Sequence, residues 1–446
     1  MNQMDKAESF VTKRFLIDII TRDIGILDAI LELVDNSLDR AIEKYRIDVT
    51  KSLIEDYNYT NDTHLEEPLT VNLHISEDEF IIEDNCGGIT KEDLEHEVFV
   101  FGLPKEGIEY IGLSAFGIGM KRAFFKLGKL VEFRTRTEQD DSTITWNIDE
   151  WMNLDDWNIP FSKIEDTGLH FTYNLPGTII KIRNLKLPVR TRFNQKEFLS
   201  ALKNRLRTSY ALFLKSGIII KLNEEDVTHS LPSIFKSEEI TYTSKYIKKG
   251  DVDIRLIAGI TPVDDRIPRG WYVFCNGRMV LEADKTQLTG WGTSYPMFHP
   301  KFNHFLGYVS FSSSDVKALP WSSTKWGVEL DSQVYNAALE EMRLQAIPIL
   351  DLLDRWKDAK EDDEPALPAL RDLLIEGQTI PIFASAKDET SFTYKPKKER
   401  PDVIRISFVK ESELVQKVKD ALGNPKMKNS AVGELVFDYF VESELN

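Results

Sequence analysis

The chain of 446 residues has few cysteines, no long apolar run and no closely spaced metal-binding side chains. Cys86 and Cys275 are too few for a disulfide framework, so we expect a reducing, cytoplasmic setting. No segment approaches the roughly 20 apolar residues that a membrane helix needs, and the opening MNQMDKAESF lacks the apolar core of a secretory signal. The seven histidines are scattered, and neither HxxxH nor CxxC spacing occurs, which argues against a structural zinc site.

Basic residues are in the minority, since 56 Lys and Arg stand against 73 Asp and Glu and the formal net charge is −17. This balance argues against a surface that binds nucleic acid over most of its area, although it leaves room for a local basic patch. The hydrophobic content of 42% and the charged content of 29% are those of a globular protein. The length predicts about two to four domains.

The order of helical and strand patterns predicts an α+β protein whose first domain is an α/β sandwich. Residues 10–46 have a helical pattern, and residues 70–75 and 80–83 alternate as the two strands of a hairpin. A glycine-rich region at 102–119 leads into a helix at about 120–127. Three further strand patterns follow: LVEFRTRT, STITWNI and GTIIKIRNL.

A second unit begins near residue 190 with the helical pattern FNQKEFLSALKNRLRTSYALFL. Strand patterns follow in GIIIKLNEEDV, VDIRLIAGI, GWYVFCNGRMV and FLGYVSFSS, and a helical pattern returns at 333–357. DAKEDDEPALPAL and KPKKERPD have the composition of linkers. The sequence therefore predicts a first domain at 1–190, an α/β domain at 191–335, a helical segment with a linker at 336–378, a flexible linker at 379–402 and a C-terminal module at 403–446.

The stretch ILELVDNSLDRAI carries an acidic stripe beside an apolar stripe at helical spacing. Glu32 and Asn36 are four residues apart and share a face of the helix. A carboxylate can accept a proton from an attacking water, and an amide oxygen is a hard ligand suited to Mg²⁺. The same spacing occurs on ordinary solvent-exposed helices, so this helix alone does not decide between a site and a surface.

Two other motifs carry candidate residues at the ends of strands. In IIEDNCGGIT, Asp84 ends a strand, where it can accept a hydrogen bond from an exocyclic amine. Gly88 lets a flat ring lie against the backbone, although an ordinary turn has the same composition. In PGTIIKIRNL, Thr178 opens a strand after a glycine turn, which is also common in proteins without a ligand.

The stretch GLSAFGIGMKRAFFKLG places glycines before a helix that starts near Met120. Glycines at such a place free backbone N–H groups to hold phosphate. A cation as early as Lys121 is not favoured by the helix dipole, and a bound polyphosphate would explain it. The loop is not a Walker A loop, because GK[ST] is missing, and no strand runs directly into it as in a dinucleotide-binding fingerprint.

These four motifs in this order resemble the GHKL ATPase superfamily, which includes gyrase B-type, MutL-type, MORC-type and heat-shock-90-type ATPases. ELVDNSLD is similar to the first motif, EDNCGGI to the adenine-binding motif, FGIGMKRAFFKLG to the MORC-type loop, and GTIIKIRNL to the strand beside the adenine. The resemblance covers about residues 10–190, with Cys86 in place of the middle glycine of D-x-G-x-G. In the second unit, FCNGRMV is similar to a MutL-type strand, and LPWSSTKWGVEL to the loop that carries a lysine to the γ-phosphate.

The resemblance implies a role for each matching residue. Glu32 would be the general base for the hydrolytic water, Asn36 would hold Mg²⁺, and Lys325 would reach the γ-phosphate of ATP from the second domain. The adenine is assigned to Asp84, Gly88 and Thr178. The phosphates are assigned to the backbone of Gly117, Ile118, Gly119 and Met120 and to Lys121.

The resemblance also implies ATP and Mg²⁺ as cofactors, slow hydrolysis, and a lid over ATP formed by residues 90–120. Lid closure would drive homodimerisation, so that the ATPase would work as a conformational switch. Two other functions stay open: an ATP-gated DNA clamp of the MORC or MutL type, which the net charge does not support, and a chaperone-like or regulatory protein with an unidentified protein client. A histidine kinase is disfavoured, and no membrane partner is expected.

Residues 403–446 have the pattern strand–helix–helix in VIRISFV, ESELVQKVKDALGN and NSAVGELVFDYFVESE. This order resembles a ribbon-helix-helix dimer, which pairs strands between chains and can read a DNA groove. The acidic side chains of both helices would repel phosphate. The sequence therefore favours a small dimerisation or docking module over a DNA-binding one.

Overall fold

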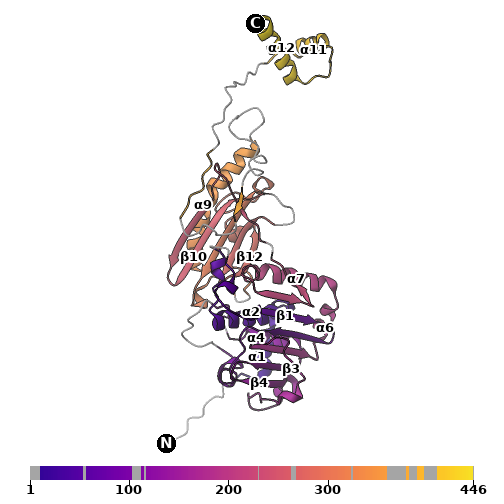
Figure 1. Ribbon diagram of the computed structural model, residues 1–446, viewed down its shortest axis with the longest axis vertical. Coiled ribbons are helices and arrows are strands. Elements are labelled where there is room, and N and C mark those ends of the chain that lie inside the picture. Colours follow the sequence, from indigo (N-terminus) through magenta and orange to yellow (C-terminus); the bar gives the residue numbers. More distant parts are fainter. Residues whose placement is uncertain are drawn as a thin grey trace, which may run out of the picture. The chain divides into compact units, whose positions relative to one another are not determined.

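The computed structural model describes residues 11–53, 57–102, 112–114, 117–229, 231–262, 268–322, 325–358, 378–380, 389–395 and 409–444. The chain forms two compact units, Met1–Pro396 and Lys397–Asn446. The first unit holds two large sheets with helices packed on them (Figure 1), which confirms the predicted α+β class. Within the described residues, no helix is both long enough and apolar enough to cross a membrane.

The first sheet has seven strands in the order β4-β3-β5-β2-β1-β6-β7. All its neighbours are antiparallel except β1 and β6, which run parallel. The predicted hairpin, the glycine-led helix and the three strand patterns after it are all present. Their bounds are β1 Thr70–Ile75, β2 Glu79–Asp84, α4 Gly119–Leu127, β3 Leu130–Arg136, β4 Asp141–Asn147 and β5 Gly177–Arg183.

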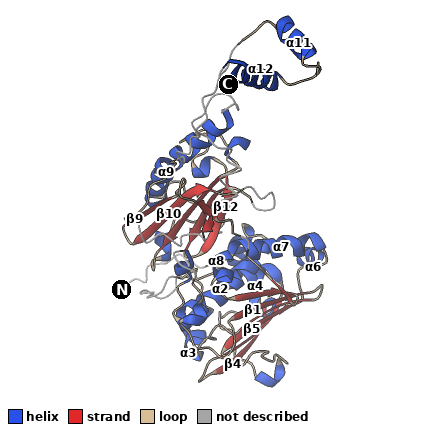
Figure 2. Ribbon diagram, turned by 45° about the horizontal axis from the view of Figure 1, so that its top comes forward, coloured by secondary structure: helices blue, strands red, loops and turns tan. Residues whose placement is uncertain are grey.

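Two helices, rather than one, occupy the predicted helical region at 10–46. Helix α1 spans Lys13–Arg22 and α2 spans Ile26–Tyr45, and the chain between them is extended at Gly25, the N-cap of α2. A single helix would not allow α1 and α2 to pack on α4 separately, as both do. Helix α2 also packs on β2, the strand that ends in Asp84. Figure 2 shows α2 and α4 beside each other next to β1 of the first sheet.

The first sheet extends beyond residue 190, where the sequence places the start of the second domain. Helices α6 Leu187–Phe193, α7 Lys196–Ser209 and α8 Ala211–Lys215 lead into β6 Ile219–Leu222 and β7 Glu225–Asp226. Strand β6 pairs in parallel with β1, and parallel neighbours need a long crossover, which the three helices provide. The predicted boundary at residue 190 thus falls between strands of one sheet, because the pattern of a strand does not reveal which sheet it joins. The division into domains stays a prediction.

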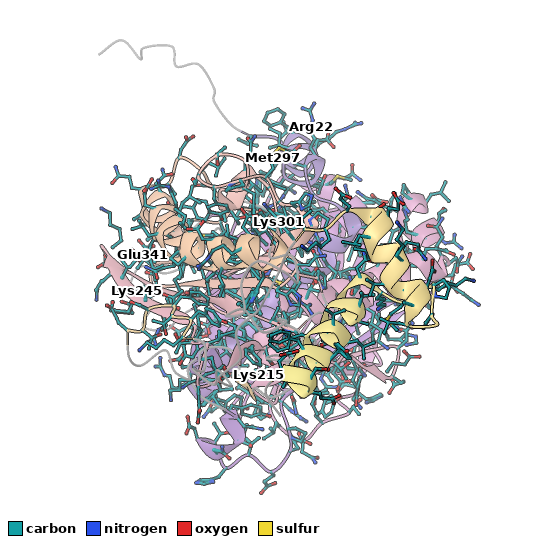
Figure 3. All side chains as sticks on the ribbon, turned by 90° about the horizontal axis from the view of Figure 1, so that it is seen from above. Arg22, Lys215, Lys245, Met297, Lys301 and Glu341 are labelled. Carbon is teal, nitrogen blue, oxygen red and sulfur yellow. The ribbon has the colours of Figure 1, made fainter. Side chains whose placement is uncertain are left out.

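The second sheet has five strands in the order β12-β11-β13-β10-β9, and it is covered by a long helix, α9 Gln333–Asp358. Asp354 of α9 forms an ion pair with Lys301, which Figure 3 labels beside this helix. Strand β9 lies in a segment that was not among the predicted strands. The strands of this part are β8 Ile234–Lys236, β9 Thr243–Lys249, β10 Val252–Ile260, β11 Gly270–Cys275, β12 Arg278–Asp284, β13 Phe305–Ser312 and β14 Gln378–Ile380, which pairs with β8.

Short helical turns connect these elements. Two of them, α3 Lys91–Asp93 and the π-helical turn Leu94–Val98, lie in the region predicted to form a lid. The others are α5 Ile148–Met152 and the 3₁₀ turns Val49–Leu53, Tyr59–Asn61, Ile164–Asp166, Gln287–Thr289, Pro300–Phe302 and Val316–Ala318.

The second unit consists of α11 Ser412–Ala421 and α12 Asn429–Glu444, which pack on each other. The predicted strand VIRISFV falls outside the described residues, so the ribbon-helix-helix resemblance stays a prediction. Val432 is the one buried residue within the two helices as described. Several large apolar side chains of this unit are exposed: Val409, Leu414, Leu422, Leu435, Val436, Phe437, Tyr439 and Phe440.

Candidate functional site

The acidic stripe of α2 lies inside the protein. Leu31, Val34 and Leu38 are buried in the core and fix the helix, and Glu32 on the other stripe is only 9% exposed. Asp35 is fully buried. A row of carboxylates in such a place must be compensated by hydrogen-bond donors or cations, because burial of an unpaired charge is strongly unfavourable. The stripe is therefore not an ordinary solvent-exposed face.

Glu32 lies against the first turn of α4. A Cβ atom at Gly119, the first residue of α4, would overlap the Oε2 atom of Glu32, so only glycine leaves room for the carboxylate. Gly117 has a φ of 64°, in the left-handed region that favours glycine. The predicted base and the predicted phosphate-binding loop are thus in direct contact.

The N-terminus of α4 offers backbone donors. In the part of the chain that the structure describes, the Ile118 side chain makes no capping hydrogen bond, and the first N–H groups of a helix have no partner within the helix. The helix dipole also places partial positive charge at this end. The segment Gly117–Met120 can therefore hold an anion next to Glu32, in agreement with the phosphate-binding role that the sequence assigns to it.

Asn36 is the predicted ligand of Mg²⁺. Its Oδ1 accepts a hydrogen bond from Ser114 Oγ at 3.3 Å, and its buried Nδ2 has no partner among the described residues. The amide thus keeps unused hydrogen-bonding capacity next to the glycine loop. Within the described residues, no group of three or more His, Cys, Asp or Glu could hold a metal by itself. Asn36 therefore fits a cation that takes its other ligands from phosphate and water.

Asp84 is buried at the end of β2 and is held in place by three donors. Ser37 Oγ of α2 donates to its Oδ2 at 2.7 Å, and the backbone N–H of Cys86 donates to its Oδ1 at 2.9 Å. The Thr178 backbone supplies a third hydrogen bond. Burial nevertheless raises the pKa of Asp84 to about 6. Above this pH both oxygens of the Asp84 carboxylate are acceptors, which favours a hydrogen bond from an amine.

Gly88 and Thr178 lie close to Asp84. Gly88 has a φ of 64°, and a Cβ there would overlap the carbonyl oxygen of Arg136. Thr178 is the register partner of Asp84 between β2 and β5, and its hydroxyl lies 3.1 Å from that of Thr135. The three residues assigned to the adenine thus form one cluster. Cys86, in the place of a family glycine, is fully buried beside it, and burial raises the pKa of its thiol.

Lys121 makes contacts that the sequence does not predict. Its ammonium donates to the carbonyls of Val98 and Val100 at 2.9 and 2.7 Å and lies over the ring of Phe101. Burial lowers its pKa to about 8. The side chain therefore ties the segment before the glycine loop to α4, and a direct contact with phosphate stays a prediction.

Lys325 reaches the site from the segment before α9, in the part of the unit that holds the second sheet. Its Nζ lies 3.2 Å from Glu32 Oε2 and 2.6 Å from Asp35 Oδ2, and the side chain is buried. Burial alone would lower its pKa, but the charges of Asp35 and Glu32 outweigh this effect and raise it. The lysine is therefore a firmly charged group beside the predicted base.

Four residues of this region were not assigned a role from the sequence: Asp35, Asp39, Tyr210 and Arg278. Asp35 accepts hydrogen bonds from Tyr210 Oη at 2.7 Å and from Arg278 Nε at 2.9 Å. Asp39 accepts from the backbone N–H of Leu113, and burial raises its pKa to about 6. Asp35 and Asp39 stand in ELVDNSLD and Arg278 in FCNGRMV, so the motifs were the available signal. Tyr210 has no local signal, because it lies at a helix end far away in the sequence.

Residues 25–173 match the family described as histidine kinase-, DNA gyrase B- and HSP90-like ATPases. A comparison with curated proteins gives no match. The matched segment contains Glu32, Asn36, Asp84 and the glycine loop, whereas Thr178 and Lys325 lie beyond it. Residues 25–173 therefore form a domain of the GHKL ATPase superfamily, whose members bind ATP.

Proposed function

We propose that this protein is a Mg²⁺-dependent ATPase that turns over slowly and acts as a conformational switch. One observation carries the proposal: three groups from distant segments meet at one point. They are Glu32 on α2, the start of α4 at Gly119, and Lys325 from the segment before α9. A base, a set of backbone donors and a cation at one point are what phosphoryl transfer to water requires.

Each group has a role that its surroundings support. The backbone of Gly117–Met120 and the dipole of α4 bind the phosphates, and Asn36 supplies an oxygen to Mg²⁺, which neutralises phosphate charge. Asp84 accepts a hydrogen bond from the adenine amino group, next to Gly88 and Thr178. Lys325 leaves Glu32 for the γ-phosphate, which frees the carboxylate to accept a proton from the attacking water.

The switch consists of the lid and a dimer contact that forms when ATP is bound. Lys121 is on the helix whose N-terminus binds phosphate, and its ammonium donates to the carbonyls of Val98 and Val100, which lie within the predicted lid. A change at the phosphates can therefore pass to the lid through α4. In this proposal the closed lid completes a surface on which two chains associate.

The C-terminal unit is proposed as an interaction module. Its two described helices bury one residue, Val432, while Phe437 and Phe440 are 52% and 56% exposed. Two helices of this size rarely fold on so small a core without a partner. A second copy of the chain is the proposed partner, and a protein client is the alternative. The net charge of −17 does not favour DNA.

Sizing of the full chain by light scattering, with and without a non-hydrolysable ATP analogue and Mg²⁺, tests the switch. We expect the mass to double with the analogue and not with ADP. The variant Glu32→Ala should dimerise with ATP itself, because it binds ATP but barely hydrolyses it. Wild-type turnover in this variant would reject the base, and an unchanged mass with bound analogue would reject the switch.

The same experiment with duplex DNA separates the alternatives. Retention of DNA that needs ATP and weakens with salt would support a clamp. The full chain with Phe437→Asp and Phe440→Asp tests the C-terminal module. Loss of association in this variant, with unchanged ATP turnover, would place the contact on α12, and unchanged association would exclude it.

A further inference from the structure

A buried ion cluster joins α2 to the second sheet. Asp35 receives three donors: Lys325 Nζ at 2.6 Å, Tyr210 Oη at 2.7 Å and Arg278 Nε at 2.9 Å. Arg278 and Lys325 are each 2% exposed, and Asp35 has no exposed surface. Glu32, three residues before Asp35 and on the same face of α2, adds the second carboxylate. Two carboxylates and two cations thus balance in a place with little exposed surface.

Arg278 holds Lys325 in two ways. Its Nε pairs with Asp35, and its Nη1 donates to the backbone carbonyl of Lys325 at 2.7 Å. Lys325 has a φ of 57°, a left-handed conformation that is unfavourable for a residue with a side chain. The guanidinium therefore fixes both the backbone of Lys325 and the carboxylate that receives its ammonium. A lysine could not make both contacts at once, because it lacks the planar fork of donors.

The turn that carries Arg278 also holds the glycine loop. Asn276 Nδ2 donates to the carbonyl of Gly112 at 2.6 Å and to that of Ser313 at 2.9 Å. The backbone N–H of Ser313 donates back to Asn276 Oδ1 at 2.9 Å. One turn between β11 and β12 thus contacts both the Lys325 backbone and the loop that leads to α4.

We propose that Arg278, through its ion pair with Asp35, is the positioning residue that aims Lys325 at the γ-phosphate. This inference rests on the proposed function and deepens it, since it names the contact through which the second sheet acts on the nucleotide. Arg278 touches neither nucleotide nor water in this scheme. Its effect on hydrolysis passes through Lys325.

A double-mutant cycle tests this dependence. Arg278→Met, Lys325→Met and the double variant are compared with wild type for kcat and for the ratio of the Kd of ADP to that of a non-hydrolysable ATP analogue. We expect each single substitution to lower kcat by about tenfold, the scale of one charge-assisted hydrogen bond. The kcat of the double variant should be no more than about twofold below that of the slower single variant, because both substitutions remove the same positioned lysine. Each substitution should also lower the ratio of the Kd of ADP to that of the ATP analogue, which measures the preference for the γ-phosphate.

Arg205→Met is the matched control. Like Arg278, Arg205 has its guanidinium over the Trp326 ring, with its Cζ 2.8 Å from the ring centroid. Its ion pair, however, is with Asp28, at 3.6 Å between Nη2 and Oδ1. Its substitution should leave kcat and the preference for the γ-phosphate unchanged. An equal loss in this variant would mean that Arg278 acts by packing on Trp326, and the proposal would fall.

Removal of one member of a buried ion pair can unfold a protein, so melting temperature is measured for each variant. If Arg278→Met does not fold, Arg278→Lys takes its place in the cycle, since it keeps the charge near Asp35 and loses the contact with the Lys325 carbonyl. Multiplicative losses in the cycle, or a folded Arg278 variant with wild-type kcat and γ-phosphate preference, would overturn the positioning role. A failure of the proposed function looks different: Glu32→Ala would then turn over ATP like wild type.

Discussion

Gly119→Ala tests the geometry around the predicted base. The backbone of Gly119 has a conformation that alanine adopts freely. The Cβ of an alanine would overlap Glu32 Oε2 and would stand 3.0 Å from its Cδ, whereas ordinary van der Waals contact begins at 3.4 Å. Because the surroundings are close-packed, the Glu32 carboxylate must move away from the start of α4 by roughly 1 Å.

The size of the expected effect follows from this displacement. A misplacement of about 1 Å costs on the order of 100-fold in rate, which corresponds to about 2.7 kcal/mol of activation free energy. We therefore expect the kcat of Gly119→Ala to fall about 100-fold. The Kd for ATP should change little, because the backbone donors of α4 remain. The melting temperature should not fall much, since alanine is the better helix former by up to about 1 kcal/mol.

Phosphate release gives kcat, and a fluorescent ATP analogue gives Kd. Combining Gly119→Ala with Glu32→Ala is the internal control, because the methyl group then has no carboxylate to displace and should cause no further loss. Gly433→Ala is the matched control for a glycine inside a helix, since its Cβ would meet nothing within 4 Å. A folded Gly119→Ala variant with wild-type kcat would refute the contact or the role of Glu32 as base.

Three further predictions concern other buried groups. Burial raises the pKa of Asp84 to about 6, so the carboxylate takes up a proton as the pH falls below this value. ATP affinity should therefore be constant above pH 7 and about tenfold weaker at pH 5. Calorimetry that shows no pH dependence of the affinity would contradict this prediction. Lys121→Met removes the hydrogen bonds to Val98 and Val100, so it should speed limited proteolysis within 94–102. The Kd for ATP should change by less than about threefold. A large loss of ATP affinity without faster proteolysis would instead make Lys121 a phosphate ligand. Cys86 and Cys275 should not react with Ellman's reagent at pH 8 in the folded protein, because both are fully buried and burial raises both thiol pKa values; labelling before unfolding would show that these sites open.

Much of the first domain could be predicted because its signals are local. The alternation in β1 and β2, the glycines before α4 and the helical spacing in α2 each depend on neighbouring residues alone. The order of the four motifs then indicated the superfamily that the match over residues 25–173 shows. The break between α1 and α2 is also local, at Gly25, but a helical pattern on both sides concealed it.

The rest depends on contacts between distant residues, which spacing does not contain. Strand β6 joins the first sheet by pairing with β1, about 150 residues earlier in the chain. Asp35 has its partners at Tyr210, Arg278 and Lys325, and no property of ELVDNSLD specifies them. The motifs therefore suggest candidate groups for contact with ATP, whereas the partners of Asp35 can be found only in the folded chain.

The partners of α2 explain why an acidic stripe persists on a buried helix. Three of its carboxylates each face at least one cation: Asp28 faces Arg205, Glu32 faces Lys325, and Asp35 faces both Arg278 and Lys325. Burial alone would raise the pKa of Asp35, but Arg278 and Lys325 together lower it. These two cations come from the part of the unit that holds the second sheet, so loss of either one would leave a buried carboxylate of α2 without one of its cations, which is strongly unfavourable. The position of α2 is therefore coupled in energy to the second sheet through these ion pairs.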